Sequence, residues 1–322
     1  MRSTIGEAGT LELSFRGIPP RADHLCRLLP LLSHAGVQEL VVNWEESFPW
    51  SIDARLAGPG SFSEKEIEGI CTVAARSNVT LVPHLARHGL PRVLDRVENF
   101  ARLARISSDW REMDVSLAAA LRMTERVIED LLAVTGDVAR IALGAVGSCG
   151  DQKLQDAYRR RFVQPLQQLL RSRGIEPLLQ PRVPDSAPAT DEFQPIETSI
   201  AQAFDLRAAE HCELATLVCP VAESANRLDR FTEESWRTLR KATSGLHAAA
   251  RHAGNRAEFL ADATLQQRLN CLGADCETLR AELASVLNSV MEAEVMAGYL
   301  TRRLAPLEEL AATTLARVRV LR

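Results

Sequence analysis

Residues 28–50 read LLPLLSHAGVQELVVNWEESFPW, and this stretch decides the fold. Leucines from Leu25 to Leu32 recur at helical spacing within residues 23–35, and Gly36 ends the predicted helix. The apolar run ELVVNW at 39–44 follows almost at once and predicts a strand. A helix that returns so quickly to a strand is the repeating unit of an α/β fold with parallel strands.

The same alternation continues on both sides of this stretch. Ser63 followed by Glu66 forms a capping box and opens a helix that runs through Ala75. Further strands are predicted at 11–15, 79–82, 139–143 and 177–180, further helices at 116–134 and 151–173, and a doubtful sixth strand at 214–221. Since a complete (β/α)8 barrel has eight strands, these elements predict a partial or degenerate TIM-type (β/α) barrel.

The last third of the chain has a different pattern. Residues 186–195 lie in a proline-rich stretch and read as a linker or loop between a partial barrel at 1–185 and a mostly α-helical region at 196–322. Apolar residues from Leu279 to Leu310 keep three/four spacing, which predicts an amphipathic helix or a helix pair broken near Pro306.

Composition excludes several classes of function. The 322 residues include 38 Lys+Arg and 42 Asp+Glu, a net charge of -4, so we expect no nucleic acid and no membrane as partner. No window holds about 18 uninterrupted apolar residues. Seven cysteines without a C-x-x-C pair suit reduced thiols in a cytoplasmic protein. We expect no cofactor. We also expect no metal, because His84 and His88 follow Pro83 in a predicted loop rather than on a helix.

Three stretches together carry a resemblance to a known family: FRGIPP at 15–20, the quoted stretch at 28–50, and FSEKEIEGICTVAARSNVTLVPHL at 62–85. In order and spacing they resemble the first third of the catalytic barrel of glycoside hydrolase family 20, most of all its hexosaminidase D branch. The resemblance implies a (β/α) barrel that acts on terminal N-acetylhexosamines. In that family the sugar's own acetamido group attacks, an Asp orients it, and the adjacent Glu protonates the leaving oxygen.

The family's catalytic signature, H-I-G-x-D-E, falls on ALGAVG at 142–147. Gly144 is kept, whereas the Asp position is Val146 and the Glu position is Gly147. Neither residue can transfer a proton or stabilise a cation. The resemblance therefore predicts the family's framework without its catalytic pair.

Other positions that matter in the family retain polar or aromatic residues. Arg16 ends the first predicted strand, where the family places a basic residue that holds sugar hydroxyls. Glu45 and Glu46 match the family's E-D pair at the end of the second strand. Trp44 and Trp50 flank this pair and would either stack on a sugar or close the top of the barrel.

Three hypotheses follow. In the first, a catalytically degenerate hexosaminidase-like protein binds an N-acetylhexosamine, a glycan or a protein partner without hydrolysis, through Arg16, Trp44, Glu45, Glu46 and Trp50. In the second, it is an active glycosidase with relocated carboxylates drawn from Glu45, Glu46 and Asp151. In the third, the C-terminal helices make it an assembly or scaffold protein that binds a protein partner or a second copy.

Overall fold

The computed structural model describes residues 9–15, 18–53, 56–85, 104–107, 110–113, 118–136, 138–143, 159–179 and 194–321. The chain divides into two compact units, residues 1–218 and residues 219–322.

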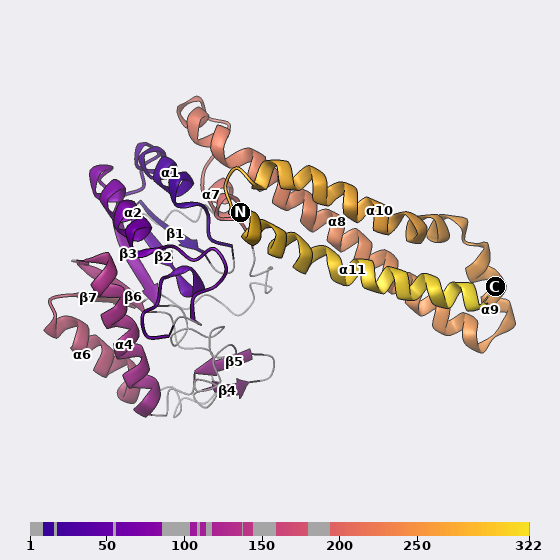
Figure 1. The fold of residues 1–322 in the computed structure, drawn as a ribbon, viewed down its shortest axis with the longest axis horizontal. Coiled ribbons are helices and arrows are strands. Elements are labelled where there is room, and N and C mark those ends of the chain that lie inside the picture. Colours follow the sequence, from indigo (N-terminus) through magenta and orange to yellow (C-terminus); the bar gives the residue numbers. More distant parts are fainter. Residues whose placement is uncertain are drawn as a thin grey trace. The chain divides into compact units, whose positions relative to one another are not determined.

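The first unit contains a sheet of five parallel strands in the order β1-β2-β3-β6-β7. The strands are β1 (Thr10–Ser14), β2 (Glu39–Asn43), β3 (Thr80–Leu85), β6 (Arg140–Leu143) and β7 (Glu176–Leu179). The helices α1 (Ala22–His34), α2 (Glu64–Arg76), α4 (Ala118–Thr135) and α6 (Gln164–Ser172) lie along one side of it (Figure 1). The five predicted strands are confirmed, and so is the partial TIM-type barrel.

Local sequence signals explain where these elements start and stop. The capping box at α2 is present: Ser63 accepts a hydrogen bond from the Glu66 backbone N–H, and the Glu66 carboxylate accepts one from the Ser63 backbone N–H at 2.7 Å. The third strand was predicted at 79–82 with a loop after Pro83, but β3 continues to Leu85, so His84 lies on a strand rather than in a loop. Pairing with β6 begins only at His84, so the missing N–H of Pro83 breaks no hydrogen bond on that side.

The two faces of the sheet differ. Leu11 and Leu13 of β1 and Val42 of β2 belong to the large core beneath the helices. On the opposite, inner face a small separate cluster forms from Val41, Val82 and Ala142, with Leu178 packed against it. This is the period-two alternation of a sheet that is covered by helices on one side only, as in a barrel wall.

A further helix, α7 (Ile196–Ala203), completes the core of this unit. It packs beside β1, and its Glu197 Oε1 lies 2.7 Å from Nε2 of His24 on α1. Both of these side chains are only 1% exposed. The region predicted to be mostly α-helical from residue 196 onward therefore begins with this short helix, and a separate 3-10 turn follows at Ala209–His211.

Two other expectations differ from the structure. The doubtful sixth strand at 214–221 is wrong, because these residues lie in α8 (Cys212–Arg251). Leu214, Val218 and Val221 are buried at spacings of four and three residues, which is a helical face. A hairpin of β4 (Ala104–Ser107) and β5 (Trp110–Met113) was not predicted.

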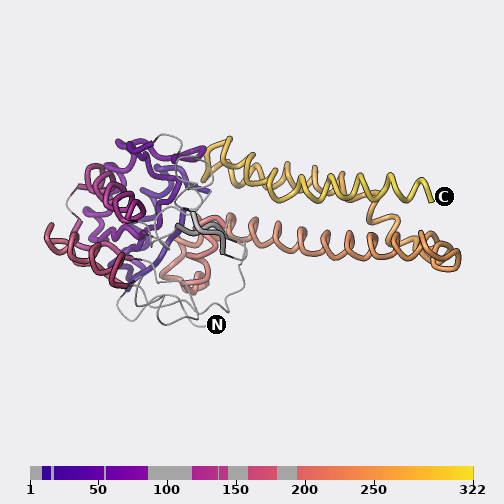
Figure 2. Tube along the Cα trace, turned by 90° about the horizontal axis from the view of Figure 1, so that it is seen from below, coloured from indigo at the N-terminus to yellow at the C-terminus, as the bar shows by residue number. Residues whose placement is uncertain are grey.

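The second unit is made of long helices. After α8 come α9 (Ala253–Ala261), α10 (Ala263–Leu287) and α11 (Ala293–Leu321), and α10 and α11 run side by side in both views (Figures 1 and 2). Ion pairs join the helices: Arg227 with Glu282, and Arg280 with Glu308 at 2.6 Å. The predicted break near Pro306 is wrong, because the chain turns at 288–292 and Pro306 lies within α11.

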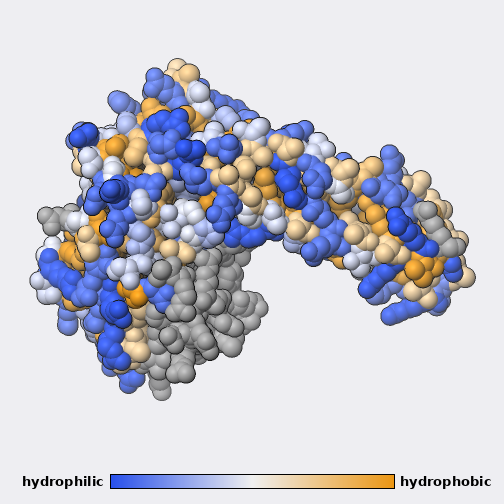
Figure 3. Space-filling model, in the orientation of Figure 1, coloured by the Kyte–Doolittle hydropathy of each residue, from blue (hydrophilic) through white to orange (hydrophobic). Residues whose placement is uncertain are grey.

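The apolar stripe from Leu279 to Leu310 is largely buried. Leu279, Leu283, Leu304 and Leu307 are at most 4% exposed. Hydrophilic residues cover much of the visible surface of these helices (Figure 3). The described residues therefore do not show the broad exposed stripe that would favour the scaffold hypothesis. No described helix is long and apolar enough to cross a membrane.

Candidate functional site

The carboxyl end of β2 carries a strained, buried glutamate. Glu45 has a backbone φ of 41°, in the left-handed region that non-glycine residues seldom adopt, and its side chain is 4% exposed. The indole N–H of Trp50 donates to the Glu45 carbonyl at 2.7 Å, and the Asn43 amide donates to Glu45 Oε1 at 3.1 Å. A strained residue that its neighbours hold so firmly is a mark of a functional site.

Glu46 and Ser47 join this turn to its surroundings. The backbone carbonyl of Glu46 accepts a hydrogen bond from the Gly58 N–H at 2.7 Å, and the Ser47 hydroxyl donates to the Phe15 carbonyl at 2.8 Å. The Glu46 side chain is 3% exposed. Both carboxylates of the predicted pair are therefore buried next to the ends of β1 and β2, the edge at which barrels of this type place their chemistry.

An aromatic cluster supports the turn. The ring of Trp44 lies 5.2 Å from Phe15 and 5.8 Å from Phe62, in edge-to-face geometry, and Phe48 lies 4.5 Å from Trp50. All five residues belong to the core on the helical side of the sheet. The structure thus shows a packing role for Trp44 and Trp50, and their contact with a sugar stays a prediction.

Asp130 of α4 anchors the loop that follows. Its carboxylate accepts hydrogen bonds from the Ser51 N–H at 2.6 Å and the Ile52 N–H at 3.2 Å, and from the Ser51 hydroxyl. Three donors on one carboxylate fix the chain between the aromatic cluster and α4. Asp130 was not singled out from the sequence, because only the fold brings it to this loop.

Polar residues on the inner face of the sheet were not assigned to a sugar site from the sequence, where His84 was considered only as a metal ligand. The strand register places Ser14 beside Asn43 and Val42 beside Pro83, so Asn43 and His84 come to the same level of neighbouring strands. His84 is 8% exposed, and its Nδ1 lies 3.0 Å from Oε1 of Glu12 on β1. The alternation in LELS at 11–14 was the available signal, since it turns Glu12 and Ser14 away from the apolar core.

Several predicted site residues lie outside the described residues: Arg16, Val146, Gly147 and Asp151. The fourth strand of the sheet, β6, ends at Leu143, immediately before the segment that contains Val146 and Gly147. Within the described part of the chain, no group of three or more His, Cys, Asp or Glu side chains could hold a metal ion.

Comparison with known proteins finds similarity to the same family that the sequence motifs resemble. No family model matches the chain. Hexosaminidase D from Homo sapiens is 23% identical over 143 residues, which are 44% of this chain and 29% of that protein. The chain therefore spans less than a third of this relative's length. The match confirms that the N-terminal half resembles the hexosaminidases.

Several solved structures that are similar to the chain are also hexosaminidases. The beta-N-acetylhexosaminidase of Streptomyces coelicolor A3(2) is 17% identical with a TM-score of 0.42, over 54% of this chain and 39% of that one. A mutant Streptomyces plicatus beta-hexosaminidase in complex with its product is 17% identical with a TM-score of 0.44, over 55% and 39%.

Proposed function

We propose that the first unit binds a terminal N-acetylhexosamine, or a glycan that carries one, without hydrolysing it. The binding site is the inner face of the sheet at the carboxyl ends of β1, β2 and β3. The observation that carries this proposal is Glu45, a buried carboxylate in strained backbone, held by Asn43 and Trp50. The similarity to Hexosaminidase D supports a sugar as the ligand.

The chemistry of these residues suits a sugar. Carboxylates accept hydrogen bonds from hydroxyls, and amides both donate and accept them. Because neighbouring groups already fix the Glu45 turn and the loop anchored by Asp130, little conformational freedom is lost when a ligand binds. Preorganised polar groups on rigid strand ends are how such sites achieve specificity.

The absence of hydrolysis follows from the resemblance. The family's reaction needs an acid and an orienting carboxylate, and the matching positions are Val146 and Gly147. General acid catalysis alone contributes about 10²- to 10⁴-fold in rate. A protein that lacks both groups can still bind the sugar but would not hydrolyse it by the family's reaction.

One observation favours the second hypothesis, an active glycosidase with relocated carboxylates. Glu45 and Glu46 are adjacent and both are buried, as catalytic carboxyl groups often are. That mechanism requires two carboxyl groups about 5–10 Å apart across one bound sugar. It predicts turnover that Glu45→Gln abolishes.

The two functions are separated by measuring binding and turnover together. Calorimetric titration with N-acetylglucosamine and N-acetylgalactosamine is compared with glucose, beside an assay with a chromogenic N-acetylglucosaminide. We expect binding of an N-acetylhexosamine, weakened about tenfold in Glu45→Gln, and no turnover. Glu68→Gln, on the exposed side of α2, is the matched control and should bind as the unmodified protein does. No binding of any of these sugars would refute the proposal.

A further inference from the structure

The imidazole of His84, on the inner face of the sheet, has a nitrogen that no described residue pairs with. His84 lies on β3 and is 8% exposed. Its Nδ1 is 3.0 Å from Glu12 Oε1, a close polar contact whose geometry falls short of a hydrogen bond. Its Nε2 is buried and has no hydrogen-bond partner among the described residues. Buried polar atoms are paired in nearly all native structures, so this atom requires an explanation.

The contact with Glu12 favours one of the two tautomers of the neutral His84 ring. A carboxylate only accepts hydrogen bonds, so the negative charge beside Nδ1 favours the proton on Nδ1. In the neutral ring, Nε2 is then an acceptor. A ligand group that pairs with it must be a donor, which means a hydroxyl or an amide N–H.

The position of His84 connects it to the proposed site. Asn43, at the level of His84 on the neighbouring strand, donates to the Glu45 carboxylate. Glu12 lies nearer the starts of the strands, because its partner in the register is Val41 rather than Asn43. Nδ1 therefore faces the amino ends of the strands, where Glu12 lies. Nε2 is then the nitrogen that can contact a ligand beside Asn43 and Glu45.

We propose that His84, oriented by Glu12, is a specificity-determining residue of the sugar site. Its Nε2 accepts a hydrogen bond from a hydroxyl or the amide N–H of the bound sugar. This inference rests on the proposed function and assigns a role in sugar binding to two residues that had no such role in the sequence analysis or the comparisons. A site built to accept from one donor of the ligand discriminates against an analogue in which that donor is missing.

The test pairs ligand analogues with variants. Dissociation constants are measured for N-acetylglucosamine and for its monodeoxy and mono-O-methyl analogues, on the unmodified protein and on His84→Phe and His84→Gln. One analogue should bind the unmodified protein about tenfold more weakly than the parent sugar, and His84→Phe should bind both equally. His84→Gln restores a polar acceptor and should recover part of the difference.

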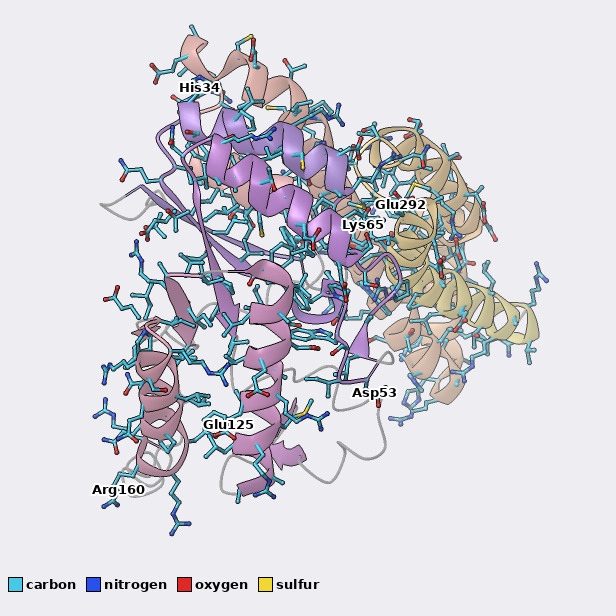
Figure 4. All side chains as sticks on the ribbon, turned by 60° about the vertical axis from the view of Figure 1, so that its left-hand side comes forward. His34, Asp53, Lys65, Glu125, Arg160 and Glu292 are labelled. Carbon is cyan, nitrogen blue, oxygen red and sulfur yellow. The ribbon has the colours of Figure 1, made fainter. Side chains whose placement is uncertain are left out.

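A matched control and a second readout keep the test decisive. His34→Phe removes an exposed imidazole at the outer end of α1 and should leave every dissociation constant unchanged (Figure 4). In the unmodified protein, the ¹⁵N resonance of His84 Nε2 should shift when the sugar binds, and that of His34 should not. This readout decides the question if His84→Phe does not fold.

Two failures are distinguishable. If the sugar binds but the His84 Nε2 resonance does not move, or if His84→Phe keeps the same preference among analogues, His84 has no such role and the proposed function stands. If no sugar of the series binds the unmodified protein, the proposed function fails and this inference fails with it.

Discussion

Replacing Glu197 with alanine tests how α7 is held to the first unit. Glu197 Oε1 lies 2.7 Å from His24 Nε2, and both side chains are 1% exposed. Removing one partner of a buried hydrogen bond leaves the other polar group unpaired, which costs about 1–3 kcal/mol. We expect the upper end, about 3 kcal/mol, because no solvent reaches the imidazole to replace the lost carboxylate. For a unit of this size the midpoint of thermal unfolding should fall by roughly 6–12 °C.

The assay is urea unfolding followed by near-ultraviolet circular dichroism. Glu210→Ala is the matched control: Glu210 is 79% exposed and 3.8 Å from His211, so its removal should cost less than about 1 kcal/mol. Glu197→Gln keeps an acceptor for the imidazole and should cost less than Glu197→Ala. A free energy of unfolding for Glu197→Ala within about 0.5 kcal/mol of the unmodified protein would refute the buried contact between α1 and α7.

Two further predictions concern the second unit. Gly245→Ala should destabilise this unit by about 1–3 kcal/mol, because a Cβ there would lie 2.5 Å from the Phe259 ring. Gly273→Ala is the control: its Cβ would meet nothing within 4 Å, so it should stabilise α10 by up to about 1 kcal/mol. If the melting temperatures of the two variants shift in the same direction, this packing is contradicted. Burial raises the pKa of Cys276 to about 11, so at pH 8 only about one thiol in a thousand is the reactive thiolate. Iodoacetamide followed by peptide mass spectrometry should therefore label the exposed Cys271 well before Cys276, and equal rates in the native state would show that Cys276 is not buried.

The alternation of helices and strands could be predicted because its signals are local. The leucine spacing up to Gly36 and the Ser63 capping box each act within a few residues. The apolar run at 214–221 was too short for periodicity to separate a strand from a helix, and the structure shows a helix. A proline is tolerated inside a long helix when packing supplies enough stability, which is why the chain turns at 288–292 instead of at Pro306.

The site was only partly predictable. Glu45 and Glu46 were found because they end a strand in a recognisable motif, but the left-handed backbone of Glu45 depends on contacts with Asn43 and Trp50. The proximity of His84 to Glu12 depends on the order of strands in the sheet, since β2 lies between the two strands that carry them. Contacts of this kind join residues far apart in the sequence, so no local pattern reveals them.

The central claim is that a hexosaminidase-like framework still binds its sugar after losing the groups that move protons. The most direct test is one time-resolved NMR experiment, in which a saturating chromogenic N-acetylglucosaminide is added to ¹⁵N-labelled protein. We predict that the resonances of Asn43, Glu45 and His84 shift at once and that no free N-acetylglucosamine signal grows over hours. A product signal that grows in the unmodified protein and is absent in Glu45→Gln, or unchanged resonances on the inner face, would contradict the claim.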